Sequence, residues 1–250
     1  TLKIERAIVP GNALRSCMLF EWQCGYYPER LARNHDFSDP HHQFTPERLT
    51  RVLNKGYRRY ATDYYRPYCR NCRECTPYRV LVGEFKPNRS MRRVLKKNSA
   101  VEAHWGTPQP TQEKFELYVR YQLSRHKETD VPVTELRRQL AAAMVRQMYT
   151  NPPTTLELTT TENGKIVGFA IFDRTLDALS AVYSAFEPDE PERSFGTLNI
   201  LLAIEKARVE RLPYLNLGLW LEHHPKMAYK RNFQPAEIYR QYRWRPLPEN

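Results

Sequence analysis

The sequence lacks the features that mark membrane and secreted proteins. No stretch approaches the ~18 consecutive apolar residues of a membrane-spanning helix, and the first residues show no basic flank followed by an apolar run of the signal-peptide type. The five cysteines are few and unevenly bunched, which favours a reducing compartment over a disulfide framework. These absences predict a globular protein of the cytoplasm with no membrane partner.

Acidic residues are scarce in one fifth of the chain, residues 48–97. This stretch holds 15 lysines and arginines but only Asp63, Glu74 and Glu84, so it carries the whole net charge of +11. Tyrosines lie among these cations, and their aromatic rings are surfaces on which nucleic-acid bases can stack. They are Tyr57, Tyr60, Tyr64, Tyr65, Tyr68 and Tyr78. RNA or DNA is the predicted partner, and a merely solvated basic face is the alternative.

Regular periodicity is weak before residue 106. Prolines interrupt this part and leave one short helix candidate at 47–56 and a strand-like run near 78–85. The segment GTPQPTQ, residues 106–112, is typical of a connector. We therefore predict an irregular, basic α/β domain that contains the cysteines at 1–105 and a more regular domain at 106–250.

The regular part has a recognisable order of elements. Hydrophobic spacing predicts helices at 112–127, 133–149, 196–211 and 226–232, and strands at 154–161, 166–173, 178–186, 214–220 and 237–244. Two helices, a run of antiparallel strands, a helix and a further strand form the order of the acyl-CoA N-acyltransferase fold. The predicted fold class is α+β, with an acyltransferase-like catalytic domain at 106–250.

The segment RSFGT, residues 193–197, precedes the third of these helices. In that fold the exposed N–H groups at the start of this helix hold an anion, and the helix dipole assists them. Ser194 as an ordinary N-cap is the alternative. A single Gly196 is less than the glycine-rich turn that a pyrophosphate needs, so an ordinary acetyl-CoA enzyme is disfavoured.

Four cysteines have a spacing that suits a metal. Cys69, Cys72 and Cys75 form a Cys-x-x-Cys-x-x-Cys motif, and Cys24 is available as a fourth ligand. Four thiolates suit either tetrahedral zinc or an iron-sulfur cluster, whose role here is structural. Free thiols are the alternative, and Cys17 is interpreted as a small buried residue.

Several long segments resemble one enzyme family. The segments CGYYPERLAR, GYRRYATDYYRPYCRNCRECTPYRV, FKPNRSMRRVLKKN, LSAVYSAFEPDEPERSFGTLNILLAIEKAR and YLNLGLWLEHHPKMAYKRNFQP are similar to those of the aminoacyl-tRNA-protein transferases, above all the bacterial leucyl branch. The resemblance implies transfer of an amino acid from aminoacyl-tRNA to the N-terminal Asp or Glu of a protein, which creates an N-degron. It favours leucine as the donor amino acid, with arginine as the alternative. A non-enzymatic RNA-binding protein with a metal module and a CoA-dependent acetyltransferase are further alternatives.

The reaction indicates which residue types to seek. An aminoacyl ester is already activated, so its transfer needs positioning and proton removal but no cofactor and no enzyme nucleophile, and the sequence has no Gly-x-Ser-x-Gly motif. The candidate catalytic residues are Tyr183, Glu222 and His223, with His224 beside them.

Binding candidates follow from charge. For the acceptor carboxylate we predict Arg66 first, then Arg79 and Lys97. Lys226, Tyr229 and Lys230 are predicted to hold the tRNA acceptor end from one helix face, and Arg89, Arg92, Arg93 and Lys96 to follow the phosphates. A leucine pocket is expected to be apolar, with Phe169, Ile171, Phe172 and Phe186 available, whereas an arginine pocket needs an acid such as Asp173, Asp177, Glu187 or Asp189.

Overall fold

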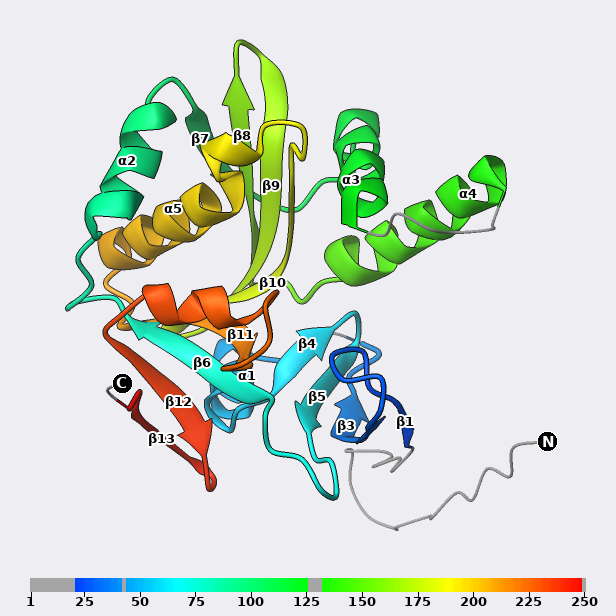
Figure 1. Cartoon of the computed structure of the whole chain (residues 1–250), viewed down its shortest axis with the longest axis vertical. Coiled ribbons are helices and arrows are strands. Elements are labelled where there is room, and N and C mark those ends of the chain that lie inside the picture. Colours follow the sequence, from blue (N-terminus) through cyan, green and yellow to red (C-terminus); the bar gives the residue numbers. More distant parts are fainter. Residues whose placement is uncertain (1–20, 42–43, 126–131, 249–250) are drawn as a thin grey trace.

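An eight-stranded sheet forms the centre of the computed structural model, which describes residues 21–41, 44–125 and 132–248 (Figure 1). Its strand order is β13-β12-β6-β11-β10-β9-β8-β7. The bounds are β6 Thr76–Leu81, β7 Glu102–Gly106, β8 Thr155–Glu162, β9 Lys165–Arg174, β10 Ala178–Phe186, β11 Tyr214–Trp220, β12 Ala236–Arg240 and β13 Arg243–Pro246. Within this sheet β10 and β11 are parallel, and the other neighbours are antiparallel. The mixed sheet with packed helices confirms an α+β fold.

The sheet takes strands from both sides of the predicted connector. β6 lies between β11 and β12, and β7 forms the edge next to β8, although both precede residue 107. The division of the chain at residue 105 stays a prediction, but the hydrogen-bonded sheet crosses it. No helix of the described residues has the length and apolar character to cross a membrane.

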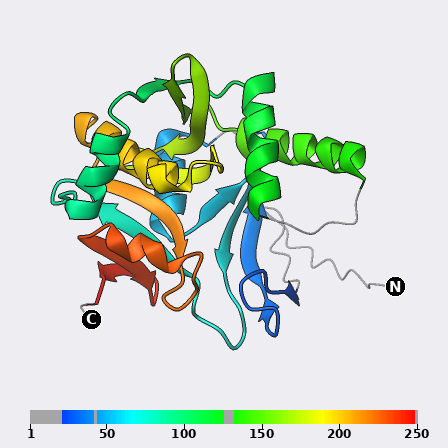
Figure 2. The ribbon, with the colours of Figure 1, turned by 45° about the horizontal axis from the view of Figure 1, so that its top comes forward.

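Helices cover both faces of the sheet (Figures 1 and 2). They are α2 Arg89–Lys97 and α5 Phe195–Val209 on one side, and α3 Gln112–Arg125, α4 Val133–Met144 and the π-helical turn Val145–Tyr149 on the other. Side chains along β9 alternate, so that Ala170 and Phe172 share a core with α5, whereas Phe169 and Ile171 pack with the helices before β8. β9 is therefore buried on both faces, which explains its nearly continuous apolar sequence.

The described residues before β6 form smaller elements beside this sheet. β3 Asn34–Ser38, β5 Asp63–Pro67 and β4 Arg58–Tyr60 make a three-stranded sheet in the order β3-β5-β4, and β1 Trp22–Gln23 pairs with β2 Leu31–Ala32. The predicted helix at 47–56 is confirmed as α1 Pro46–Asn54. It begins where the Thr45 hydroxyl accepts from the Arg48 N–H, and it buries Leu49 and Leu53 against Tyr64.

Three predicted details are wrong. Residues 89–97 form helix α2, which begins where the Asn88 side chain accepts from the Met91 N–H. The predicted strand 237–244 is two strands, β12 and β13, joined by a turn in which Gln241 and Tyr242 have φ of 51° and 62°. The predicted helix 226–232 is a 3-10 helix that covers Ala228–Asn232.

The parallel strands β10 and β11 pair only at their beginnings. The pairing joins Ala178–Ser180 to Tyr214–Asn216, and both strands then continue without pairing with each other. Each strand has an irregularity at that point, between Ala181 and Tyr183 in β10 and between Asn216 and Gly218 in β11. The sheet is therefore open between the carboxyl ends of its two parallel strands.

Candidate functional site

A cleft of about 680 Å³ lies where β10 and β11 part, between the first turn of α5 and residues 225–230. Its polar lining includes Arg58, Gln122, Tyr183, Ser194, Thr197, Asn199, Lys226 and Lys230. Its apolar lining includes Phe172, Phe186, Ile200, Leu217 and Met227. No Asp or Glu of the described residues lines the cleft, so its formal charges are all positive.

The beginning of α5 faces this cleft through Ser194, Gly196 and Thr197. Ser194 has φ of 55°, and its side chain makes no capping hydrogen bond, so the ordinary N-cap alternative is wrong. Its carbonyl instead accepts from the N–H groups of Thr197 and Leu198. A Cβ at Gly196 would lie 2.9 Å from the Phe186 ring, which explains why this position has no side chain. The positive end of the helix dipole thus points toward the cleft.

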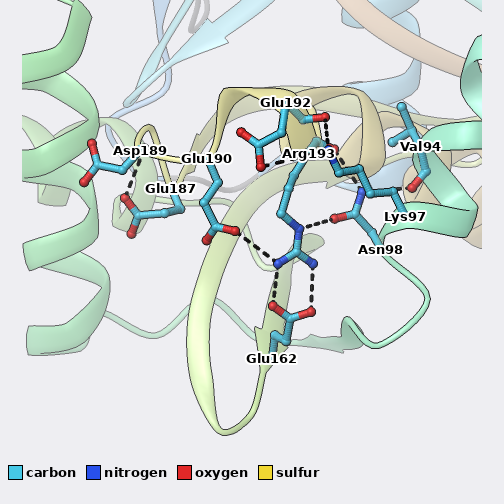
Figure 3. A network of polar contacts seen from close by, with 9 residues as sticks. All are labelled: Val94, Lys97, Asn98, Glu162, Glu187, Asp189, Glu190, Glu192 and Arg193. Carbon is cyan, nitrogen blue, oxygen red and sulfur yellow. Dashed lines mark hydrogen bonds and ion pairs between the residues drawn. The ribbon is translucent and has the colours of Figure 1, made fainter.

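Arg193 fixes the loop that leads into α5 (Figure 3). It donates to both carboxylate oxygens of Glu162, at 2.5 and 2.7 Å, and to the Asn98 side chain at 2.9 Å. The Arg193 guanidinium accordingly lowers the pKa of the Glu162 carboxyl. Lys97, a predicted carboxylate binder, donates to the Glu192 carbonyl in the same network. This ion-pair network ties α2 to the start of α5 and holds the helix end in place.

Asn199 is the most unusual polar residue of the cleft. It lies one turn into α5, only 2% of it is exposed, and neither atom of its side-chain amide has a hydrogen-bond partner among the described residues. An unpaired buried amide costs about 1–3 kcal/mol, so such a group is expected to meet a ligand. Sequence analysis missed this residue. The available signal was one amide inside the apolar run LNILLAIEKA.

Tyr183, a predicted catalytic residue, lines the same cleft from strand β10. Gln122 donates to its hydroxyl, and the Tyr118 ring meets it edge to face at 6.0 Å. Burial raises the pKa of Tyr183 above its ordinary value, so the hydroxyl keeps its proton at neutral pH. Tyr183 can therefore orient a reacting group by donating a hydrogen bond.

Lys230 is buried rather than displayed on a helix face. Only 6% of it is exposed, and its Nζ donates to the Leu219 carbonyl. Burial and the positive charge of Arg58 hold the pKa of Lys230 well below its usual value, while Cys75 acts in the opposite direction. Lys226 and Tyr229 are exposed, and Lys226 precedes the 3-10 helix. All three line the cleft, but the predicted common helix face does not exist.

The other two catalytic candidates lie in the turn after β11. Glu222 and His223 are exposed, and neither is among the residues that line the cleft beside Tyr183. A Glu222 oxygen is 4.0 Å from Arg231. His224 packs instead against the rings of Tyr26 and Tyr27.

A second concave surface, which we call the basic groove, separates residues 66–77 from β12 and β13. It encloses about 900 Å³, and its cations are Arg66, Arg73, Arg240 and Arg245. The Arg66 guanidinium donates to the Lys55 carbonyl and lies 5.3 Å from the ring of Tyr242, of which 72% is exposed. Arg66 therefore lies in this groove and not in the cleft.

Arg79 has internal partners. It forms an ion pair with Glu237 at 2.6 Å, and its guanidinium lies between the rings of Tyr214 and Trp244, at 3.6 and 4.2 Å from their centres. Asn54 accepts a further hydrogen bond from it. These contacts make Arg79 a link between β6 and β12 instead of a free carboxylate site.

The four cysteines of the predicted metal site lie near one another. Backbone N–H groups of Tyr26 and Arg33 donate to the sulfurs of Cys24 and Cys69. Burial, together with the charges of the other three thiols, raises the pKa of Cys75 to about 12. Among the described residues, however, no three His, Cys, Asp or Glu side chains are arranged to hold a metal ion.

The predicted phosphate-binding residues lie together on α2. Arg89, Arg92, Arg93 and Lys96 are exposed, and Met91 is the buried side chain of this helix. None of the four basic residues forms an ion pair with a described acidic residue, so their charge is available to a partner.

Comparison with known proteins identifies the family. A profile described as "Arginine-tRNA-protein transferase, C terminus" matches residues 113–240, and its N-terminus counterpart matches residues 22–93. An aspartate/glutamate leucyltransferase of Leptospira interrogans is 38% identical over 218 residues, which cover 87% of this chain and 84% of the relative. The chain therefore belongs to the arginine-tRNA-protein transferase family, as the resemblance predicted.

A second relative, an aspartate/glutamate leucyltransferase of Marinobacter nauticus, is 35% identical, and the match covers 90% of this chain and 92% of the relative. Among solved structures, that of FemX aligns with a TM-score of 0.49 at 8% identity, over 85% of this chain and 71% of that one.

Proposed function

We propose that this protein transfers leucine from leucyl-tRNA to the N-terminal Asp or Glu of acceptor proteins, a reaction that fits the name aspartate/glutamate leucyltransferase of its relatives. The observation that carries this proposal is the lining of the cleft. An arginyl group needs an acidic partner, but the cleft has apolar walls and no lining carboxylate among the described residues. A leucyl side chain fits such walls. The positive charges suit the acidic acceptor and the tRNA.

The reaction is a direct aminolysis. The acceptor's α-amine nitrogen attacks the ester carbonyl carbon, an amide bond forms, and the bond to the terminal ribose oxygen of the tRNA breaks. One proton leaves the amine, and one proton joins the released ribose oxygen. No covalent enzyme intermediate is needed, which fits a cleft that presents positioning groups instead of an activated nucleophile.

The residues of the cleft suit distinct parts of this reaction. The unpaired amide of Asn199 and the N–H groups at the start of α5 supply hydrogen-bonding groups for the aminoacyl ester and its developing oxyanion. The Tyr183 hydroxyl orients the reacting groups. Lys230 lines the cleft and has a lowered pKa, so we assign it the role of accepting the amine proton. Glu222 and His223 remain weaker candidates because they lie outside the lining.

Charged surfaces beyond the cleft suit the tRNA. We assign α2 to the phosphates of the acceptor arm, and Arg66 with the other cations of the basic groove to a further part of the tRNA. Both surfaces offer arginines that pair with no acidic side chain of the described residues, and the groove adds the exposed ring of Tyr242. We also propose that residues 106–250 form an acyltransferase-like catalytic domain and that the protein is located in the cytoplasm.

We further propose that the four cysteines hold a structural zinc ion or iron-sulfur cluster. Their spacing in the sequence supports this proposal. Binding would have to draw the thiols closer together than they lie in the described structure, and no catalytic step passes through the metal. Elemental analysis of the purified protein beside its Cys75→Ser variant tests it. Absence of metal from the wild-type protein, or equal metal in both proteins, would reject the site.

A transfer assay tests the proposed function. Peptides that begin with Asp, Glu or Ala are incubated with tRNA charged with labelled leucine or arginine. We expect label to move from leucyl-tRNA to the Asp and Glu peptides only. Transfer from arginyl-tRNA would reject the choice of donor, and binding of tRNA without any transfer would favour a non-enzymatic RNA-binding protein.

A further inference from the structure

Arg58 is a half-buried arginine of the cleft with no assigned role. It lies on β4 next to Arg59, and successive side chains of a strand point in opposite directions. Arg59 points into a buried ion pair with Asp173, whereas Arg58 reaches the opening between β10 and β11. In Figure 1, β4 lies directly beside the ends of these strands, and β4 contacts β10.

Contacts with the backbone fix the position of the Arg58 guanidinium. Its Nη2 donates to the Ala181 carbonyl at 3.2 Å, at the irregularity where β10 stops pairing with β11. Its Cζ lies against Gly218 on the other strand, where a Cβ would collide with it. Gly218 also has φ of 77°, a conformation that favours glycine. The opening in the sheet thus holds one guanidinium group between its two strands.

The charge of Arg58 has no counter-ion within the described residues. No acidic side chain forms an ion pair with it, and no carboxylate lines the cleft that it faces. Its basic neighbour is Lys230, which offers no counter-ion and whose pKa is lowered by burial and by the charge of Arg58. Since a half-buried cation without a partner is unfavourable, its remaining donors are expected to meet an anion that a ligand brings.

The proposed reaction supplies one anion close to the reacting atoms. The leucyl group has no negative charge, but the acceptor must place its α-amine in the cleft, and the carboxylate of an N-terminal Asp or Glu lies only a few bonds from that amine. A guanidinium held in a fixed position suits a planar carboxylate, because two of its N–H groups can donate in parallel. We propose that Arg58 binds the side-chain carboxylate of the acceptor's N-terminal Asp or Glu and thereby sets the acidic specificity, an inference that rests on the proposed function.

Substitution of Arg58 tests this role through the choice of acceptor. Leucine transfer is measured for the wild-type protein, Arg58→Gln and Arg58→Lys with peptides that begin with Asp, Glu, Asn or Gln, and leucyl-tRNA binding is measured in parallel. Asn and Gln are nearly isosteric with the acids but uncharged. Arg66→Gln is the matched control, because Arg66 lies in the basic groove instead of the cleft.

We expect Arg58→Gln to raise KM for the Asp and Glu peptides about tenfold or more, which matches the loss of a charged hydrogen bond. We expect the wild-type protein to transfer leucine more slowly to the Asn and Gln peptides, and we expect these rates to change little in Arg58→Gln. The ratio of the transfer rate with the Asp peptide to that with the Asn peptide should therefore fall strongly. Arg58→Lys keeps the positive charge but lacks the two parallel N–H donors of the guanidinium. Its KM for the Asp and Glu peptides should therefore lie between those of the wild type and Arg58→Gln. Arg66→Gln should retain the wild-type ratio, and leucyl-tRNA affinity should be the same in both Arg58 variants and the wild type.

Two results would overturn the assignment. An equal loss with Asp and Asn peptides would mean that Arg58 acts on the ester or on the structure, and a loss of leucyl-tRNA affinity would mean that it binds a tRNA phosphate. If Arg58→Gln does not fold, the ratio measured with Arg58→Lys decides. If the wild-type protein transfers leucine to none of the peptides, the proposed function itself is rejected. If the enzyme is active but Arg58→Gln keeps the preference for Asp and Glu, only the role of Arg58 is rejected.

Discussion

Arg59 and Asp173 form a two-pronged ion pair that joins the small N-terminal sheet to the central sheet. The donor–acceptor distances are 2.7 and 2.8 Å, and the exposed fractions of the two side chains are 0% and 1%. Thr155 also donates to Asp173, so the carboxylate is well satisfied. Since Arg58 is the neighbour of Arg59 on β4, this pair also fixes the strand that carries a cation into the cleft.

The first prediction concerns the stability of this pair. Asp173→Asn should destabilise the protein by about 3–5 kcal/mol, because it leaves a buried arginine without a charged partner. That loss corresponds to a fall in Tm on the order of ten degrees, measured by calorimetry. The double variant Arg59→Met with Asp173→Leu should recover much of the loss. A double variant as unstable as the sum of both single variants would contradict this account.

The second prediction concerns Lys230 and pH. Its pKa in the folded protein lies below the unfolded value of about 10.4, so the unfolded chain binds more protons and stability rises with pH in the window between the two values. The Tm of Lys230→Met relative to wild type should therefore be highest near neutral pH and fall as the pH approaches 10. Lys226→Met, at an exposed position, is the control and should show no such trend. A Tm difference that is flat from pH 7 to 10 would argue that Lys230 is solvated.

The third prediction separates stability from activity at Asn199. Asn199→Leu removes two unpaired amide atoms from a buried position, so we expect Tm to rise by a few degrees, in line with about 1–3 kcal/mol of relieved desolvation. Leucine transfer should fall about tenfold or more if the amide hydrogen-bonds the ester. Thermal unfolding and kcat/KM are measured on the same preparation. Unchanged transfer would remove Asn199 from the site.

The fourth prediction concerns the exposed basic face of α2. Arg92→Gln with Arg93→Gln should weaken tRNA binding and make the slope of log K against log salt shallower by about 0.7–0.9 for each phosphate that is no longer neutralised. Binding is measured from low to moderate salt. Lys165→Gln, which replaces an exposed cation at the start of β9, is the control and should leave the slope unchanged. An unaltered slope in the double variant would place the tRNA elsewhere.

The elements with strong periodicity could be predicted from the sequence. The Asn163-Gly164 turn, with positive φ at both residues, joins β8 to β9, which correspond to the predicted strands 154–161 and 166–173. Helix α2 was missed because Met91 is its one buried side chain, so its apolar signal is weak. The turn of β12 and β13 was missed because Gln241 and Tyr242 take conformations that usually select glycine or asparagine.

The candidate site was predictable only where its residues follow one another in the chain. Tyr183 and Gly196 belong to a strand and a turn that the pattern places together, and both line the cleft. Arg58 and Asn199 were missed, because their importance depends on which side chains lack partners. Among the described residues, Arg58 lacks a counter-ion and the Asn199 amide lacks a hydrogen-bond partner because of the opening between β10 and β11, and this opening cannot be predicted from any local stretch of the sequence.

The central position of β6 has a consequence for synthesis of the chain. β6 is complete at Leu81, but its two neighbours begin only at Tyr214 and Ala236. At ordinary translation rates the ribosome needs on the order of ten seconds to make the intervening residues. Throughout that time both edges of the strand lack their partners, and residues that are buried in the folded protein stay exposed, a state that is open to aggregation. The segment that is synthesised early is thus paired last, so the hydrogen bonds at the centre of the sheet form only when synthesis is nearly complete.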